Sequence, residues 1–194
     1  HAGESADVAS GPEVILGRVD LLFERLLAEH EAPGELWGLG IGVPGPVEFR
    51  TGVPISPPIM PGWEGCPVRE RFAERHHAPV WVDNDVNIMA LGEWRDGLAR
   101  GRRNFVYVKV GTGIGSGIVS NGLIHRGAQG SAGDIGHIQV VGGTGEICRC
   151  GKLDCLEALA GGAALAREGT ALAESGESER LAAILADRGR ITAR

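Results

Sequence analysis

Long apolar runs are missing from this chain, and so is any excess of positive charge. None of its apolar stretches approaches the ~18 residues of a membrane-spanning helix, and no signal-peptide pattern stands at the start. We therefore expect no membrane span. Lys and Arg number 19 against 25 Asp and Glu, a net charge of −6. A nucleic-acid-binding face needs clustered basic side chains, so this segment is not expected to bind DNA or RNA.

Cysteine is also scarce, and the pairs typical of zinc fingers are absent. The chain has four cysteines and no Cys-x-x-Cys pair, which excludes the finger and ribbon types of zinc site. No internal repeat or low-complexity tract is visible. Glycine, in contrast, is abundant at 32 residues, which predicts many tight turns and close approaches of backbone. With 43% hydrophobic and 23% charged residues, the composition is that of an ordinary globular protein.

Three of the cysteines lie close together, and a histidine lies upstream of them. The order is His137-x10-Cys148-x-Cys150-x4-Cys155. Three thiolates and one imidazole fill all four positions around a tetrahedral zinc ion, so the metal is expected to hold a loop rather than to catalyse. The alternatives are a disulfide with a spare thiol, or buried cysteines acting as small apolar side chains; the short spacings favour chelation. With Cys66 left over as an apparently free thiol, this cysteine usage predicts the reducing cytoplasm.

A glycine-rich turn joins two predicted strands. The turn over 111–117 follows a strand over 105–110 and leads into a hairpin over 118–124, whose Asn-Gly pair suits a two-residue turn. A dinucleotide-binding fingerprint needs a helix after the glycines, so a strand there excludes it. Backbone N–H groups could still bind a phosphate as a nest, and a tight turn between core strands is equally compatible. The residues that could contact phosphate are Gly111, Thr112, Gly113 and Gly115.

Asp83, Asn84 and Asp85 stand where a buried strand meets the start of a helix predicted over 85–98. Ligands of α/β folds bind at the carboxyl ends of strands, and the helix dipole favours a carboxylate on the first turn. Asp85 could then hydrogen-bond a ligand hydroxyl or accept its proton. Capping of the helix is the alternative role, open to each of the three residues.

A second polar cluster surrounds the cysteine loop. Asp134 precedes His137 by about one turn and Glu157 follows the last cysteine by two residues, so a bound metal would fix all three. Paired carboxylates at fixed positions suit the vicinal hydroxyls of a sugar, and Asn84 can add a donor and an acceptor.

Strands alternate with helices along the chain, which predicts the α/β class. Alanine-rich helices are predicted over 156–168 and 179–188 near the end of the chain. Residues 1–10 resemble a tag remnant or a linker.

Together these motifs resemble the ROK family, which groups bacterial sugar kinases with sugar-responsive transcriptional repressors. Five stretches in the family's order carry the resemblance: GIGVPGPV from Gly40, VDNDVN from Val82, VGTGIGSGI from Val110, HRGAQGSAGDIGH from His125 and CRCGKLDCLE from Cys148. The resemblance implies an actin-like ATPase, ribonuclease-H-like fold of two lobes with a sugar in the cleft between them. Residues 11–100 would belong to the N-terminal lobe, and residues 101–194, with a zinc loop over 137–155, to the larger lobe.

The resemblance also implies roles for individual residues. The zinc ligands would be His137, Cys148, Cys150 and Cys155. The sugar would be lined by Asn84, Asp85, Asp134, His137 and Glu157. In family kinases the residue that matches Asp85 is the general base, and the glycine turn contacts the phosphates of Mg-ATP. Family members are often dimers or tetramers, so a homo-oligomer is expected.

The chain departs from the family pattern in sequence and in extent. Asp134 stands where Glu is usual, so a sugar contact could be lost or made through water. Asp154 replaces a usual glycine, which makes that turn less relaxed if its φ is positive. The family's DxGGT phosphate motif is absent, and the chain stops before the last part of the larger lobe. We therefore expect a fold that is incomplete at both ends.

Two functions are compatible with these residues. The preferred expectation is the sugar-sensing effector domain of a ROK transcriptional regulator, which binds a hexose or N-acetylhexosamine, carries a structural zinc and contacts DNA only through a segment before His1. The alternative is an ATP-dependent sugar kinase with Asp85 as general base. The Asn84-Asp85 pair and the intact GTGIG turn favour the kinase. The surroundings of Asp134 resemble actinobacterial regulators of the family.

Overall fold

The computed structural model describes residues 1–29 and 35–193 and divides the chain into two compact units. Unit 1 comprises residues 1–91 and 126–132, and unit 2 comprises residues 92–125 and 133–194. The chain therefore passes between the units three times, at 91–92, 125–126 and 132–133. Among the described residues, no helix is long and apolar enough to cross a membrane.

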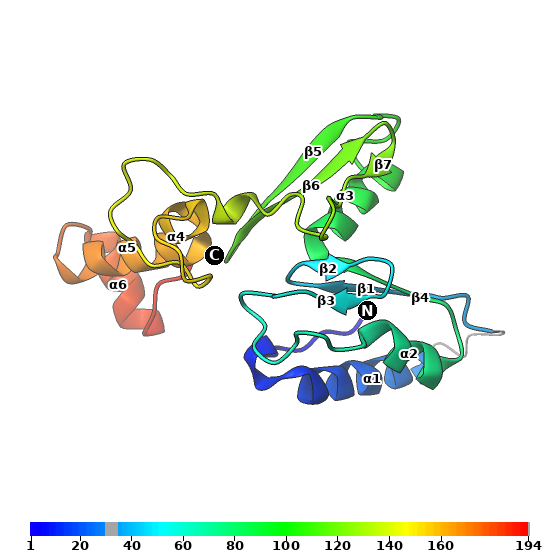
Figure 1. The fold of residues 1–194 in the computed structure, drawn as a ribbon. Coiled ribbons are helices and arrows are strands. Elements are labelled where there is room, and N and C mark those ends of the chain that lie inside the picture. The colour runs from blue at the N-terminus through cyan, green and yellow to red at the C-terminus, as the bar shows by residue number, and fades with distance from the viewer. Residues whose placement is uncertain (30–34, 194) are drawn as a thin grey trace. The chain divides into compact units, whose positions relative to one another are not determined.

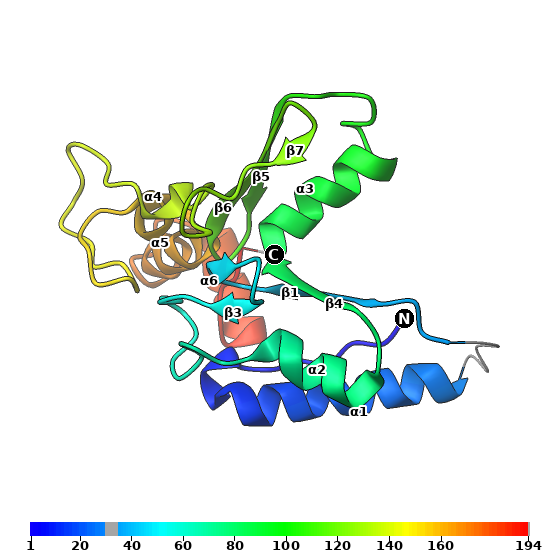
Figure 2. The same ribbon diagram turned by 45° about the vertical axis from the view of Figure 1, so that its right-hand side comes forward.

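Unit 1 packs two helices against one face of a parallel strand pair. The strands β1 (Leu39–Val43) and β4 (Val80–Asn84) run in register from Leu39 opposite Val80 to Val43 opposite Asn84. The helices α1 (Pro12–Glu29) and α2 (Val68–His76) lie on the same side of this pair in both views (Figures 1 and 2). A short 3-10 helix, η1 (Val8–Ser10), precedes α1, and β2 (Val47–Glu48) pairs antiparallel with β3 (Val53–Pro54).

The core of unit 1 lies between these helices and strands. Its buried members are Leu16, Leu39, Val43, Val47, Met60, Trp63, Val68, Phe72, Val80 and Val82. Each large apolar side chain buried in this way contributes roughly 1.5–3 kcal/mol. The indole N–H of Trp63 donates to the Val8 carbonyl at 3.1 Å, so the backbone before α1 is tied to this core. That residues 1–10 are a tag remnant or linker stays a prediction.

Unit 2 contains an antiparallel sheet in the order β5-β6-β7. Strand β5 (Phe105–Val110) turns into β6 (Ile114–Ser120), and β6 into β7 (Leu123–Ile124). Asn121 and Gly122 form the second turn with φ of 54° and 77°, as the Asn-Gly pair predicts. A strand follows the glycine turn, so the exclusion of a dinucleotide-binding fingerprint is confirmed.

Helices complete the fold. Helix α3 (Asp85–Asp96) starts in unit 1 and ends in unit 2, and η2 (Ile135–His137), α4 (Leu156–Ala160), α5 (Gly162–Glu174) and α6 (Glu179–Arg188) lie in unit 2. The prediction of one helix over 156–168 is wrong, because Gly161 separates α4 from α5. The Gly162 N–H donates to the Gly111 carbonyl at 2.7 Å, and a Cβ at Gly162 would lie 2.6 Å from that oxygen. The chain bends at Gly161 to meet the glycine turn.

Candidate functional site

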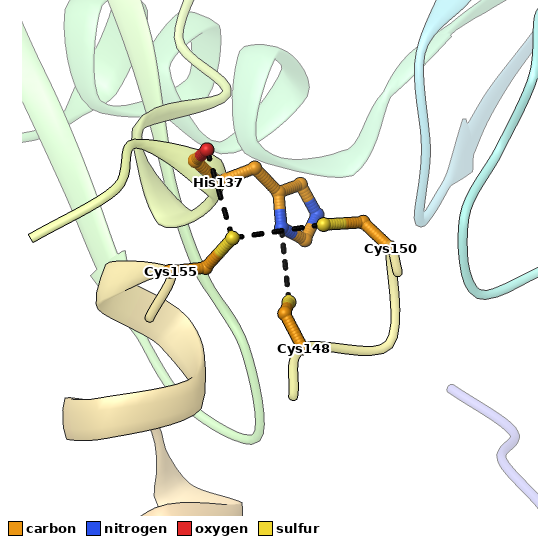
Figure 3. Close-up of side chains that lie close together, drawn as sticks. All are labelled: His137, Cys148, Cys150 and Cys155. Carbon is orange, nitrogen blue, oxygen red and sulfur yellow. Dashed lines mark hydrogen bonds between the residues drawn. The ribbon is translucent and has the colours of Figure 1, made fainter. Parts of the chain in front are cut away.

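The four predicted zinc ligands lie together in unit 2, and their side chains point toward one another (Figure 3). Their ligand atoms all lie within 4.8 Å of one another. Cys148 Sγ is 3.4 Å from His137 Nδ1, and Cys150 Sγ is 3.6 Å from Cys155 Sγ. With bonds of about 2.3 Å to sulfur and about 2.0 Å to nitrogen, a tetrahedral zinc ion holds two sulfurs about 3.8 Å apart and sulfur and nitrogen about 3.5 Å apart. The donor spacing therefore fits zinc.

Local backbone structure brings these ligands to one place. His137 ends η2, and Cys155 immediately precedes the first residue of α4. An isolated antiparallel bridge between Gln139 and Cys155 holds the two ends of the loop together. Between them, the Cys148 N–H donates to the Lys152 carbonyl at 2.8 Å and closes the turn that carries the two middle thiols.

Burial sets the protonation of the thiols. Cys155 is 0% and Cys148 4% exposed. Burial, together with the neighbouring thiols of Cys150 and Cys148, raises the pKa of Cys155 to about 12. At Cys150 burial also acts to raise the pKa, but hydrogen bonds from the Lys152 backbone and from the two other thiols outweigh it and lower the pKa overall. A divalent cation that displaces the thiol protons would stabilise such a cluster, so the residues present fit a closed zinc site.

Asp154 shows how the loop accommodates the departure from glycine. Its φ is +55°, in the left-handed region that favours glycine. Its carboxylate Oδ1 accepts hydrogen bonds from the N–H groups of Gly145 at 2.8 Å and Glu146 at 3.0 Å. Short polar side chains reduce the cost of this conformation through such local bonds. The turn is therefore strained at Asp154 but also tied to the opposite side of the loop.

Glu157 lies against the glycine turn. Its side chain is buried, and Oε2 accepts a hydrogen bond from the Ile114 N–H at 3.0 Å. The other oxygen, Oε1, accepts from Arg149 Nη2 at 3.1 Å. A Cβ at Gly113 would lie 2.4 Å from Glu157 Oε2, so this position of the turn needs glycine.

Asp134 lies close to His137, one of the four members of the His/Cys cluster. With His137 Nδ1 facing the thiols, Nε2 is 3.9 Å from Asp134 Oδ1. Burial raises the pKa of Asp134; the charge of Glu157 adds to this, while His137 and Lys152 oppose it. Unit 2 thus groups Asp134, His137 and Glu157 around one loop.

The predicted phosphate-binding residues divide between turn and strand. Gly111, Thr112 and Gly113 form the turn, where the Gly111 N–H donates to the Gly113 carbonyl at 2.9 Å. Gly115 lies within β6, opposite Lys109. Phosphate binding by these four residues stays a prediction.

In unit 1, the structure assigns the capping role that was left open for the Asp83–Asp85 motif. Asn84 is the cap: its Oδ1 accepts from the Val86 N–H at 2.9 Å, and its Nδ2 donates to the Gly45 carbonyl at 3.1 Å. Asp85 is half-buried on the first turn of α3. Asp83 is buried and paired with Arg126, a partner that sequence reasoning missed. Arg126 lies within one of the quoted motifs, but nothing in its spacing indicates this pairing.

Comparison with known proteins identifies the family. Residues 19–189 match the model of the ROK family. The chain belongs to the ROK family. It is 40% identical to a glucokinase from Halalkalibacterium halodurans, covering 90% of this chain and 53% of that protein. It is 33% identical to a xylose repressor from Caldicellulosiruptor bescii, covering 83% of this chain and 40% of the repressor.

Solved structures give the same result. A ROK family glucokinase from Streptomyces griseus, in complex with glucose and AMPPNP, matches with a TM-score of 0.74 and 32% identity over 88% of this chain and 53% of its own. A ROK family transcriptional regulator, a homologue of the E. coli MLC protein, matches with a TM-score of 0.73 and 28% identity over 84% of this chain and 41% of its own. The predicted fold class, the actin-like ATPase fold of ROK sugar kinases, is thus confirmed. The chain spans about half the length of the glucokinases it matches.

Proposed function

We propose that this chain forms the sugar-binding part of an ATP-dependent sugar kinase of the ROK family. The observation that carries the proposal is the position of Asp85 on the first turn of α3, directly after the capping Asn84. A carboxylate held at a helix N-terminus is stabilised in its charged form by the helix dipole. A group of that kind can accept a proton from a sugar hydroxyl.

In the proposed reaction Asp85 takes the proton of the accepting hydroxyl. The sugar oxygen then forms a bond to the γ-phosphorus of ATP, the bond from that phosphorus to the bridging oxygen breaks, and ADP leaves. Hydrogen bonds to Val86 and Gly45 fix Asn84, and this holds the backbone at the neighbouring Asp85 in place. Rigid placement of the base supports proton transfer because the reacting groups need little reorganisation.

We further propose that the sugar contacts the residues that the family resemblance implies, Asn84, Asp85, Asp134, His137 and Glu157. His137 Nδ1 faces the thiols, so its Nε2 would carry the proton and donate to a sugar oxygen. Zinc, when bound to His137, Cys148, Cys150 and Cys155, would supply structural support that fixes the imidazole and the loop. The carboxylates would accept hydrogen bonds from sugar hydroxyls.

The sugar-sensing regulator preferred from the sequence is the second candidate. The structural match to a ROK transcriptional regulator supports it, because it is nearly as close as the match to a glucokinase. In that case sugar binding would shift the equilibrium between two conformations of the whole protein. This shift would change the affinity with which a segment outside this chain binds DNA. The higher sequence identity to a glucokinase and the position of Asp85 favour the kinase.

A phosphoryl-transfer assay on the whole protein separates the two. ADP release would be measured with ATP, Mg²⁺ and, in turn, glucose, N-acetylglucosamine, N-acetylmannosamine, mannose, fructose and xylose, alongside sugar binding by calorimetry. Sugar-dependent ADP release supports the kinase. Saturable sugar binding without turnover supports the regulator, and no binding to any of the six sugars contradicts both. The cytoplasmic location and the homo-oligomer stay predictions.

A further inference from the structure

The carboxylate of Asp83 accepts three hydrogen bonds at the end of β4 and is ion-paired with Arg126. Its Oδ1 accepts from the Asn84 N–H at 2.8 Å and from Asn87 Nδ2 at 2.9 Å. Its Oδ2 accepts from Arg126 Nε at 2.9 Å and forms an ion pair with Arg126 Nη2 at 2.7 Å. Asp83 is only 6% exposed. A buried carboxylate with this many donors is held in one orientation.

Arg126 is itself fixed on two sides. Its guanidinium carbon lies 3.7 Å from the centroid of the Phe49 ring, a cation–π contact. Only 25% of its side chain is exposed. Arginine suits such a place because its planar guanidinium can stack on a ring and bind a carboxylate through two N–H groups at once.

The backbone that carries Arg126 is also anchored within unit 1. The Arg126 carbonyl accepts from the Ala132 N–H at 3.0 Å, which closes the segment 126–132 on itself. A Cβ at Gly130 would lie 2.1 Å from the Val47 carbonyl, so this segment runs directly against β2. Arg126 therefore reaches Asp83 from a backbone of defined position.

We propose that Asp83 and Arg126 are positioning residues that hold Asn84 and Asp85 in place for the sugar. This inference rests on the proposed function of Asn84 and Asp85. Through Oδ1, Asp83 binds the backbone N–H of Asn84 and the side chain of Asn87, on the first turn of α3. Arg126 holds the other oxygen and balances the buried charge, so loss of Arg126 frees Asp83 to reorient and releases the first turn of α3.

The test compares Arg126→Met with Arg69→Met in the whole protein. Arg69 also lies near the Phe49 ring, at 6.0 Å, but its guanidinium donates to the Phe49 and Arg50 carbonyls rather than to Asp83. Arg126→Met is expected to weaken binding of the tightest-binding sugar of the panel by about tenfold or more. Hydrogen exchange at the amides of Asn84 and Val86 should speed up in the same variant. Arg69→Met should change neither quantity.

Two further variants keep the result decisive. Arg126→Lys keeps the charge but loses the planar guanidinium that contacts Asp83 through Nε and Nη2, and should give an intermediate effect. This variant serves as the test if Arg126→Met does not fold. In the double variant Asp83→Asn/Arg126→Met, Arg126→Met should weaken sugar binding much less than it does in the unaltered protein, because the two residues act as a pair. Unchanged sugar affinity and unchanged amide exchange in Arg126→Met and Arg126→Lys would overturn the positioning role. If the unaltered protein binds no sugar, the proposed function fails, whereas the amide exchange still decides whether Arg126 holds Asn84.

Discussion

Glu157 Oε2 accepts a hydrogen bond from the Ile114 backbone N–H at 3.0 Å, across 43 residues of sequence. The same carboxylate binds Arg149, which stands between the thiols of Cys148 and Cys150. The glycine turn and the loop that carries Cys148 and Cys150 are therefore joined through one buried side chain of unit 2. A substitution in the glycine turn should therefore alter the loop around Arg149, and a substitution in that loop should alter the turn.

Replacement of Gly113 by Ala should destabilise the protein. The new Cβ would lie 2.4 Å from Glu157 Oε2, so the carboxylate must leave the Ile114 N–H or the turn must shift. Overpacking of this kind costs about 1–3 kcal/mol, measurable by chemical unfolding. Gly111→Ala is the matched control, because a Cβ there meets atoms only at 3.8 Å or beyond. Equal stability of the two variants would mean that Glu157 is not held as described.

If the His/Cys cluster binds zinc as proposed, replacement of Cys150 by Ser should remove the metal. Loss of a ligand is expected to weaken zinc binding more than the 10- to 100-fold typical of changes around the ligands, so by more than about 100-fold. Metal content by mass spectrometry and chelator competition would measure this. Cys66→Ser is the control, because Cys66 lies in unit 1, outside the cluster. Full zinc content in Cys150→Ser would contradict the four-ligand site.

Zinc affinity should rise with pH. Because burial raises the pKa of Cys155 to about 12 in the metal-free protein, that thiol is protonated at neutral pH, and zinc must displace its proton. Each displaced proton changes the apparent affinity by about tenfold per pH unit, so affinity falls as the solution is made more acidic. Competition with a chelator between pH 6 and 8, corrected for the chelator's own titration, measures the slope. A flat profile would show that the thiols are already ionised before the metal binds.

Asp85→Asn should abolish turnover while leaving sugar binding measurable, if the whole protein is a kinase. A general base contributes about 10²- to 10⁴-fold to the rate, and the amide cannot accept the proton while it still forms hydrogen bonds. Steady-state kinetics and calorimetry on one preparation separate the two effects. Asp96→Asn, an exposed change at the last residue of the same helix, should leave both unaltered. Retained turnover in Asp85→Asn would remove Asp85 as the base.

Local features of the fold could be predicted because neighbouring residues determine them. The Asn121-Gly122 turn has the positive φ angles expected of its residue types. The cluster of His137, Cys148, Cys150 and Cys155 is foreseeable for a related reason, because three of its four members lie within eight residues. The family resemblance is confirmed by the match over residues 19–189.

The features that were missed depend on contacts between distant residues. Gly161 ends α4 because the following backbone meets Gly111, about fifty residues earlier in the chain. An alanine-rich pattern contains no sign of that contact and predicts a continuous helix. The pairing of Asp83 with Arg126 is hidden in the same way, since it spans 43 residues and depends on how segment 126–132 returns to unit 1.

That return of the chain has a consequence for how the protein is made. Synthesis proceeds from the N-terminus, so Asp83 leaves the ribosome well before Arg126, and the strands β5, β6 and β7 are made in between. Unit 1 therefore cannot reach its final packing until residues 126–132 have been synthesised. By then the ribosome has already made all three strands of the sheet in unit 2. A fragment cut after residue 91 would keep α1, α2 and both parallel strands yet bury the Asp83 charge without its partner. Such a fragment should be recovered as an aggregation-prone intermediate rather than as a folded domain.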